Sequence, residues 1–200
     1  MSSHKTPKRI GIYAGTFNPV HAGHVAFALQ ALKAGKLDAL FFMPERQPRG
    51  KPGVEHFGHR VAMLRRASKP HSRFGVLEMP DVNFSVGRTI PRLKKQFPNS
   101  ELVFLFGSDV VPSIHAWQNA DQLLENYEII AGLRGNDTEQ TLKALTASWP
   151  QKIHFVHSYA PAVSSHKIRE ALRRRQYDAQ GLLASVRRYS DRHWLYVSLA

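Results

Sequence analysis

The 200-residue sequence contains no cysteine, which excludes disulfide bonds and thiolate-ligated metal sites. It also contains no apolar run long enough to cross a membrane, no internal repeat and no low-complexity tract. Residues 1–8 are polar and basic and do not contain the apolar core of a secretory signal, so we expect a flexible basic tail there. The length predicts one domain over residues 9–200, and the absence of cysteine fits the reducing cytoplasm.

Acidic residues are scarce: 15 aspartates and glutamates face 28 lysines and arginines, for a net charge of +13. Such an excess predicts an anionic partner, which could be a nucleic acid or a nucleotide. Much of the excess falls late in the chain, at Lys167, Arg169, Arg173, Arg174, Arg175, Arg187, Arg188 and Arg192. For residues 173–175, a solvated helix face explains the charges equally well.

Short apolar runs alternate with segments of helical periodicity. The runs predict strands at Ile10–Tyr13, Leu37–Met43, Phe74–Leu77, Leu102–Phe106, Ile129–Ala131 and Ile153–Val156. The periodic segments predict a helix with Val25, Leu29 and Leu32 on its buried stripe, and helices at Phe57–Arg66, Val86–Phe97, Thr138–Ala147, Ser164–Arg175 and Ala179–Tyr189. This order predicts an α/β fold with a doubly wound, Rossmann-like parallel sheet. A basic loop at 45–53 follows the second strand, at the edge where such sheets bind ligands.

The stretch from Tyr13 to His24 predicts a phosphate site. The first strand ends at Gly15, a turn follows, and His21 and His24 come three residues apart in the first turn of the next helix. A helix N-terminus attracts anions, and Gly23 between the histidines lets a ligand approach the backbone. The alternative is that two histidines fall near a helix start by chance.

A second basic turn opens the helix predicted after residue 163. Ser164 or Ser165 is a suitable N-cap. The first turn of a helix disfavours cations, yet His166, Lys167 and Arg169 crowd it. A bound polyphosphate would supply the missing negative charge, although a tolerated basic turn would cost only a few tenths of a kcal/mol. We expect His24 and Arg169 to lie on exposed first turns.

Both stretches resemble signatures of the HxGH nucleotidylyltransferase superfamily. The first is carried by Gly15-Thr16-Phe17-Asn18-Pro19 and His21-Ala22-Gly23-His24, and the second by Ser164, Ile168 and Arg169. Within the superfamily, the chain resembles the bacterial nicotinate mononucleotide adenylyltransferases through Phe106-Gly107-Ser108-Asp109, Trp117, Arg134-Gly135 and the ending His193-Trp194-Leu195-Tyr196. It departs from their pattern at Ala14, Asn18, Gln47–Lys51, Ser85–Gly87 and His166.

The resemblance implies transfer of the adenylyl group of ATP to nicotinate mononucleotide, which forms nicotinate adenine dinucleotide and pyrophosphate. It implies that His21, His24 and Arg169 are catalytic. It implies ATP and phosphate binding by Gly15, Thr16, Phe17, Gly23, Ser164, Ser165, His166 and Lys167. It implies acceptor binding by Gly107, Ser108, Asp109, Trp117 and Arg134. Mg²⁺ is expected to bridge the phosphates without protein ligands.

Three alternatives remain open from the sequence. A sister enzyme could use nicotinamide mononucleotide or an alcohol phosphate as acceptor, or CTP as donor. A nucleic-acid-binding module would explain the charge but not the two histidine and arginine signatures, so specific nucleic-acid binding is not expected. A non-catalytic relative is disfavoured by the presence of His21, His24 and Arg169. Without the resemblance, Trp117 would be a core residue and Asp109 a helix N-cap.

Overall fold

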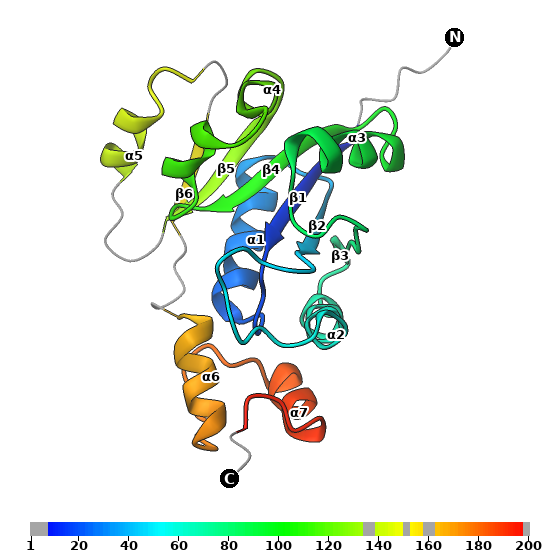
Figure 1. The fold of residues 1–200 in the computed structure, drawn as a ribbon, viewed down its shortest axis with the longest axis vertical. Helices are drawn as coiled ribbons and strands as arrows, with labels where there is room; N and C mark the ends of the chain where they lie inside the picture. Colours follow the sequence, from blue (N-terminus) through cyan, green and yellow to red (C-terminus); the bar gives the residue numbers. More distant parts are fainter. Residues whose placement is uncertain (1–7, 134–138, 150–152, 158–162, 198–200) are drawn as a thin grey trace.

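The computed structural model describes residues 8–133, 139–149, 153–157 and 163–197. Its centre is a six-stranded, fully parallel sheet in the order β3-β2-β1-β4-β5-β6 (Figure 1). The strands are β1 (Arg9–Gly15), β2 (Ala39–Pro44), β3 (Phe74–Val76), β4 (Glu101–Gly107), β5 (Glu128–Leu133) and β6 (Ile153–His157). This order is that of a doubly wound sheet, which confirms the predicted fold class.

Helices cover both faces of the sheet. They are α1 (Ala22–Ala34), α2 (Phe57–Ser68), α3 (Val86–Gln96), the 3₁₀ helix η1 (Val111–Ala116), α4 (Ala120–Asn126), α5 (Glu139–Leu145), α6 (Ser165–Arg173) and α7 (Ala184–Arg192). One apolar cluster joins α1, α2, α6 and α7 to one face, and a second joins α3, η1 and α4 to the other. In Figure 1, α6 and α7 lie together at the end of the molecule opposite the N-terminus.

Strand β4 shows why the strongest strand signal of the sequence becomes the centre of the sheet. Val103 and Leu105 pack into the cluster under α1, whereas Phe104 and Phe106 pack into the cluster under α3. A strand that is buried on both faces needs apolar side chains at every position rather than at alternate ones. The run from 102 to 106 is therefore central, as its composition predicts.

Helix α1 buries Leu32 as expected, and Val25 packs partly against the same cluster, but Leu29 is not buried. Leu29 is 42% exposed, and the buried positions are His24, Phe27, Ala28, Ala31 and Leu32. These follow the spacing i, i+3, i+4, i+7, i+8 of a complete helical face. The expectation for Leu29 was wrong because the small alanines and the aromatic Phe27 fit against the sheet.

Two further differences concern the helices. Helix α7 begins at Ala184 rather than Ala179, because Gly181 adopts a φ of +83° and its carbonyl accepts a hydrogen bond of 2.9 Å from the Ala22 N–H. Helices η1 and α4 occupy a region for which no helix bounds were predicted, since they span only 6 and 7 residues. Thr138, the expected start of α5, lies outside the described residues.

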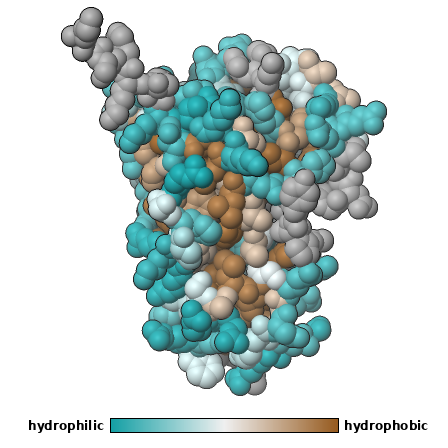
Figure 2. All heavy atoms as spheres, turned by 180° about the vertical axis from the view of Figure 1, so that it is seen from behind, coloured by the Kyte–Doolittle hydropathy of each residue, from teal (hydrophilic) through white to brown (hydrophobic). Residues whose placement is uncertain are grey.

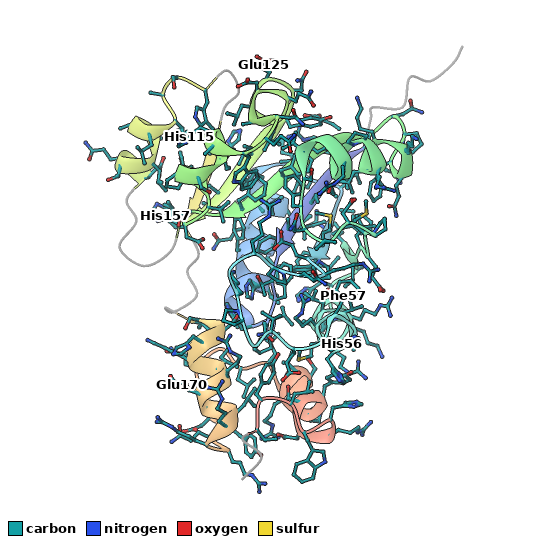
Figure 3. The ribbon with its side chains drawn as sticks, viewed as in Figure 1. His56, Phe57, His115, Glu125, His157 and Glu170 are labelled. Carbon is teal, nitrogen blue, oxygen red and sulfur yellow. The ribbon has the colours of Figure 1, made fainter. Side chains whose placement is uncertain are left out.

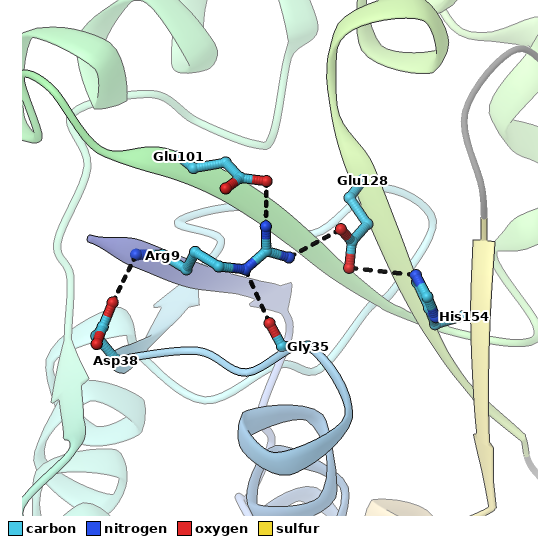
Figure 4. A network of polar contacts seen from close by, with 6 residues as sticks. All are labelled: Arg9, Gly35, Asp38, Glu101, Glu128 and His154. Atoms are coloured by element: carbon cyan, nitrogen blue, oxygen red, sulfur yellow. Dashed lines mark hydrogen bonds and ion pairs between the residues drawn. The ribbon is translucent and has the colours of Figure 1, made fainter. Parts of the chain in front are cut away.

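Arg9 connects the amino ends of three strands (Figure 4). Its guanidinium pairs with Glu101 of β4, bonds Glu128 of β5 at 2.8 Å, and donates to the Gly35 carbonyl at 2.9 Å. His154 of β6 lies 3.5 Å from the same Glu128. This network lies at the amino ends of the strands, away from the carboxyl ends where ligands bind, so we assign it a structural role.

Apolar residues reach the surface along the middle of the rear face, between hydrophilic margins (Figure 2). Among the described residues, no helix combines the length and the apolar character that a membrane span requires.

Candidate active site

The site lies at the switch point of the sheet, between two neighbouring strands whose following helices lie on opposite faces. Neighbouring strands β1 and β4 lead into α1 on one face and η1 on the other, and a crevice opens between the loops that leave them. A cavity of about 980 Å³ occupies this crevice. The predicted residues that line it are Gly15, Thr16, Phe17, His21, Gly23, His24, Gly107, Asp109, Trp117, Ser164, Ser165, His166, Lys167 and Arg169.

The two histidines of the first signature lie in close contact at the start of α1, with their ring planes tilted by 30°. Their ring centroids are 3.7 Å apart, and the His21 N–H donates to Nδ1 of His24 at 3.2 Å. His21 is the N-cap and His24 the third helical residue, so the contact closes the first turn. Both side chains are buried, at 5% and 8% exposure, which corrects the expectation of an exposed His24.

Gly23 is needed for the shape of this turn. A side-chain carbon at position 23 would lie 3.1 Å from ring atoms of His21. Any larger residue would push against the imidazole that lies over it. Glycine at position 23 therefore leaves room for the His21 ring, and it also opens the backbone toward the cavity.

Helix α6 is attached to the first signature by two hydrogen bonds. Arg169 Nη1 donates to the Asn18 carbonyl at 2.8 Å, and Ser165 Oγ donates to the Pro19 carbonyl at 3.0 Å. These contacts bridge about three quarters of the chain length in sequence, and they place the starts of α1 and α6 on one cavity. The two predicted phosphate regions are thus parts of one site.

The first turn of α6 is basic, as the sequence indicates. Ser164 is the N-cap, and its hydroxyl accepts a hydrogen bond from the Lys167 N–H at 3.2 Å. No acidic residue lies in that turn. His166 is exposed, and its Nε2 lies 3.6 Å from Oε2 of Glu170, which is labelled on α6 in Figure 3.

Two further basic side chains line the cavity without having been assigned a role. Lys51, in the loop after β2, places its Nζ 3.0 Å from Oγ1 of Thr16. His157 ends β6 at the same edge of the sheet (Figure 3). The signal for Lys51 was the basic loop at 45–53, and the signal for His157 was its place at the end of a strand.

The other wall of the cavity is aromatic. Trp117 packs with ring-centroid distances of 5.5 Å to Phe106 and 5.8 Å to Phe84, and all three line the cavity. Trp117 is half-buried, so it is neither a core residue nor fully exposed. Asp109 does not cap η1, because the N-cap there is Val110.

One of the residues expected near the acceptor, Ser108, is placed differently. Ser108 is 1% exposed, does not line the cavity, and donates its N–H to the Gly132 carbonyl at 2.9 Å. Its place is inside the turn after β4 rather than at the cavity surface. Arg134 lies outside the described residues.

Beneath the site, a buried arginine holds the loops together. Arg60 of α2 is 0% exposed and lies among main-chain oxygens. Its guanidinium donates to four carbonyls, at distances between 2.7 and 3.0 Å, those of Thr16, Glu45, Arg46 and Glu55. Burial lowers the pKa of Arg60 from its ordinary value, but a guanidinium starts far above neutrality and stays charged. The sequence carries no signal for this role, since the contacts go to backbone atoms.

The described lining of the cavity is cationic. It contains Lys51, Lys167 and Arg169 against Glu45 and Asp109, with four histidines in addition. Among the residues that the structure describes, no group of three histidine, cysteine, aspartate or glutamate side chains is arranged to hold a metal ion. Hydrogen-bond donors therefore dominate, and the arrangement suits a polyanion.

Comparisons with known proteins identify relatives of the whole chain. The cytidylyltransferase-like family model matches residues 12–171. The chain is 32% identical to a probable nicotinate-nucleotide adenylyltransferase of Desulfitobacterium hafniense, over 98% of this chain and 99% of that protein. It is also 32% identical to the nicotinate-nucleotide adenylyltransferase of Bacillus subtilis, over 96% and 100% of the two chains. The fold matches the Plasmodium falciparum nicotinic acid mononucleotide adenylyltransferase complexed with NaAD, with a TM-score of 0.78, 17% identity and coverage of 94% and 97%.

Proposed function

Since the chain belongs to the cytidylyltransferase-like family, as a member similar over its whole length to nicotinate-nucleotide adenylyltransferases, we propose that it joins ATP and nicotinate mononucleotide. The products are nicotinate adenine dinucleotide and pyrophosphate, so the enzyme serves NAD biosynthesis. The observation that carries the proposal is the cavity at the β1–β4 switch point. There, two basic helix starts face a wall of aromatic side chains.

The reaction is an in-line displacement at phosphorus. An oxygen of the acceptor phosphate attacks the α-phosphorus of ATP, the bond to the bridging oxygen of the β-phosphate breaks, and pyrophosphate leaves with that electron pair. No covalent enzyme intermediate is required, so the protein contributes positioning and charge stabilisation.

His21 and His24 are proposed to hold phosphate oxygens at the reacting centre. Nδ1 of His24 accepts from the His21 N–H, so the neutral ring of His24 carries its proton on Nε2. A donor fixed in this way needs no reorganisation as negative charge develops on the phosphate oxygens.

Helix α6 is proposed to hold the β- and γ-phosphates. Arg169 and the N–H groups at Ser165 face the cavity, and Lys167 and His166 add charge in the same turn. Lys51 is proposed to approach the triphosphate from the loop after β2. Gly15, Thr16 and Phe17 form the floor against which the nucleotide lies.

The aromatic wall is proposed to bind the acceptor. Trp117 would stack on the pyridine ring, and Asp109 and Gly107 would bind the ribose at the end of β4. Arg134 is proposed as a further acceptor ligand on sequence grounds alone. Because ATP is drawn from the cytoplasmic pool, we place the reaction in the cytoplasm.

Mg²⁺ is proposed to enter with ATP. The two carboxylates of the described lining come from different loops, and Glu45 already accepts a hydrogen bond of 3.1 Å from the Phe84 N–H. The charged side chains that remain in the lining are cationic, so the phosphates themselves would hold the ion, together with water. When bound, Mg²⁺ neutralises charge on the triphosphate.

A substrate panel tests the proposal. Pyrophosphate release is measured with ATP or CTP as donor, and with nicotinate mononucleotide, nicotinamide mononucleotide or an alcohol phosphate as acceptor. We expect the highest kcat/KM for ATP with nicotinate mononucleotide, with product identified by mass, and loss of activity with EDTA. Pyrophosphate at background for every pair would contradict the enzyme assignment, and preference for another pair would reassign the substrate.

A further inference from the structure

Asn18 is hydrogen-bonded to three residues that are distant from it in the sequence, Glu55, Arg169 and Tyr196. Its side-chain oxygen accepts a hydrogen bond of 2.8 Å from the Tyr196 hydroxyl and one of 3.3 Å from the Glu55 N–H. Its main-chain oxygen accepts from Arg169 at 2.8 Å. The residue is only 4% exposed, so these partners determine its position.

Tyr196 reaches this point from the end of the described chain. It is 7% exposed and is itself held by its main-chain N–H, which bonds Oε1 of Glu55 at 3.3 Å. Burial first, and the charge of Glu55 second, raise the pKa of the Tyr196 hydroxyl above its ordinary value. The hydroxyl therefore stays protonated at neutral pH and donates a hydrogen bond. Its acceptor is the side-chain oxygen of Asn18, a buried residue.

Tyr196 does not line the cavity, whereas Asn18 and Arg169 both do. We propose that Tyr196 is a positioning residue, which holds Asn18 so that the Asn18 carbonyl fixes the Arg169 guanidinium for phosphate binding. Asn18 connects Tyr196 to Arg169, because its side-chain oxygen accepts a hydrogen bond from Tyr196 and its main-chain oxygen accepts one from Arg169. The inference rests on the proposed role of Arg169 toward ATP.

Tyr196→Phe removes only the hydroxyl, and Tyr189→Phe is the matched control. Tyr189 is also buried, and its hydroxyl lies 3.0 Å from His59 Nδ1, outside the cavity. One lost hydrogen bond corresponds to about a threefold to tenfold change in an equilibrium constant. We expect Tyr196→Phe to weaken ATP affinity by about that factor, and Tyr189→Phe to leave it within about twofold.

The same substitution in an Arg169→Ala background separates positioning from general stability. If Tyr196 acts through Arg169, Tyr196→Phe adds no further loss of ATP affinity there. An equal loss in both backgrounds, or equal affinities of Tyr196→Phe and Tyr189→Phe, would overturn the proposal. If Tyr196→Phe does not fold, as judged by its melting temperature, Asn18→Ala removes the acceptor of the same hydrogen bond. We then expect the same loss of ATP affinity from Asn18→Ala.

ATP binding, measured by calorimetry without acceptor, keeps this inference distinct from the proposed function. An unaltered chain that binds ATP but forms no product with any acceptor counts against the proposed function alone. Unchanged ATP affinity in the folded Tyr196→Phe variant counts against the role of Tyr196 alone.

Discussion

The main-chain N–H of His21 donates to Nδ1 of His24 over 3.2 Å, and this bond determines which nitrogen of His24 can serve a ligand. Because Nδ1 is occupied as an acceptor, the neutral ring donates through Nε2. His24 thus has a fixed tautomer, set by the turn that its own signature forms.

His24→Ala should therefore lower turnover by about 10²- to 10³-fold, the usual cost of one lost transition-state donor. It should also lower the melting temperature, because the ring is buried between His21 and the edge of Phe17. Leu29→Ala, on the exposed side of the same helix, is the control and should change neither quantity appreciably. Single-turnover rates with saturating ATP measure the effect. Near-normal turnover in a folded His24→Ala protein would refute the proposed role of His24.

Trp117→Ala should weaken acceptor binding more than ATP binding, since only the acceptor ring is proposed to stack there. The stacking contribution is on the order of 1 kcal/mol beyond area burial, or several-fold in affinity. KM values for both substrates measure the effect. Trp194→Ala is the control, because Trp194 is 70% exposed and outside the cavity. Equal losses for both substrates would instead identify Trp117 as a packing residue.

Arg60→Met should lower the free energy of unfolding by about 3 kcal/mol or more, because it leaves four buried carbonyls without their charged donor. Urea titration measures the loss. Arg66→Met in the same helix is the control, because Arg66 is exposed: it donates to the Ala62 carbonyl of its own helix, and its guanidinium carbon lies 4.2 Å from the centre of the Tyr189 ring. A change as small as that of Arg66→Met would show that water or neighbouring donors replace the guanidinium.

The basic surface should bind nucleic acid only weakly. The charge excess of the cavity is explained by a nucleotide, so we expect micromolar or weaker dissociation constants for RNA and DNA at physiological salt, without sequence preference. Fluorescence anisotropy with unrelated oligonucleotides over a salt series measures this. Nanomolar binding to one sequence would show that residues 167–192 have a separate function.

The sheet, and the meeting of the two signatures on one cavity, could be predicted from the sequence for a physical reason. Continuous apolar runs mark strands buried on both faces, and the doubly wound order brings the ends of β1 and β4 together. The signatures at Gly15 and Ser164 are local, so their residue order alone indicates their chemistry.

The supporting contacts could not be predicted in this way. Arg60 bonds to carbonyls, which every residue has, and Tyr196 bonds to Asn18 across 178 positions of sequence. Neither contact leaves a periodic pattern. Leu29 was misplaced for a related reason, since the register of α1 depends on which face packs best rather than on which residues are most apolar.

The two basic helix starts should act on one triphosphate, and His24→Ala combined with Arg169→Ala tests this. The Arg169–Asn18 bond joins α6 to the loop that leads into α1, so both donors approach the cavity from one connected frame. Arg169→Ala should raise the ATP requirement, because its contacts already form in the ground state. His24→Ala should lower turnover more than ATP affinity, because its contact strengthens as charge develops. If both hold one ligand in register, the double variant loses less than the sum of the two free-energy changes. Full additivity in single-turnover rate and ATP affinity would mean that the two helices act on separate groups.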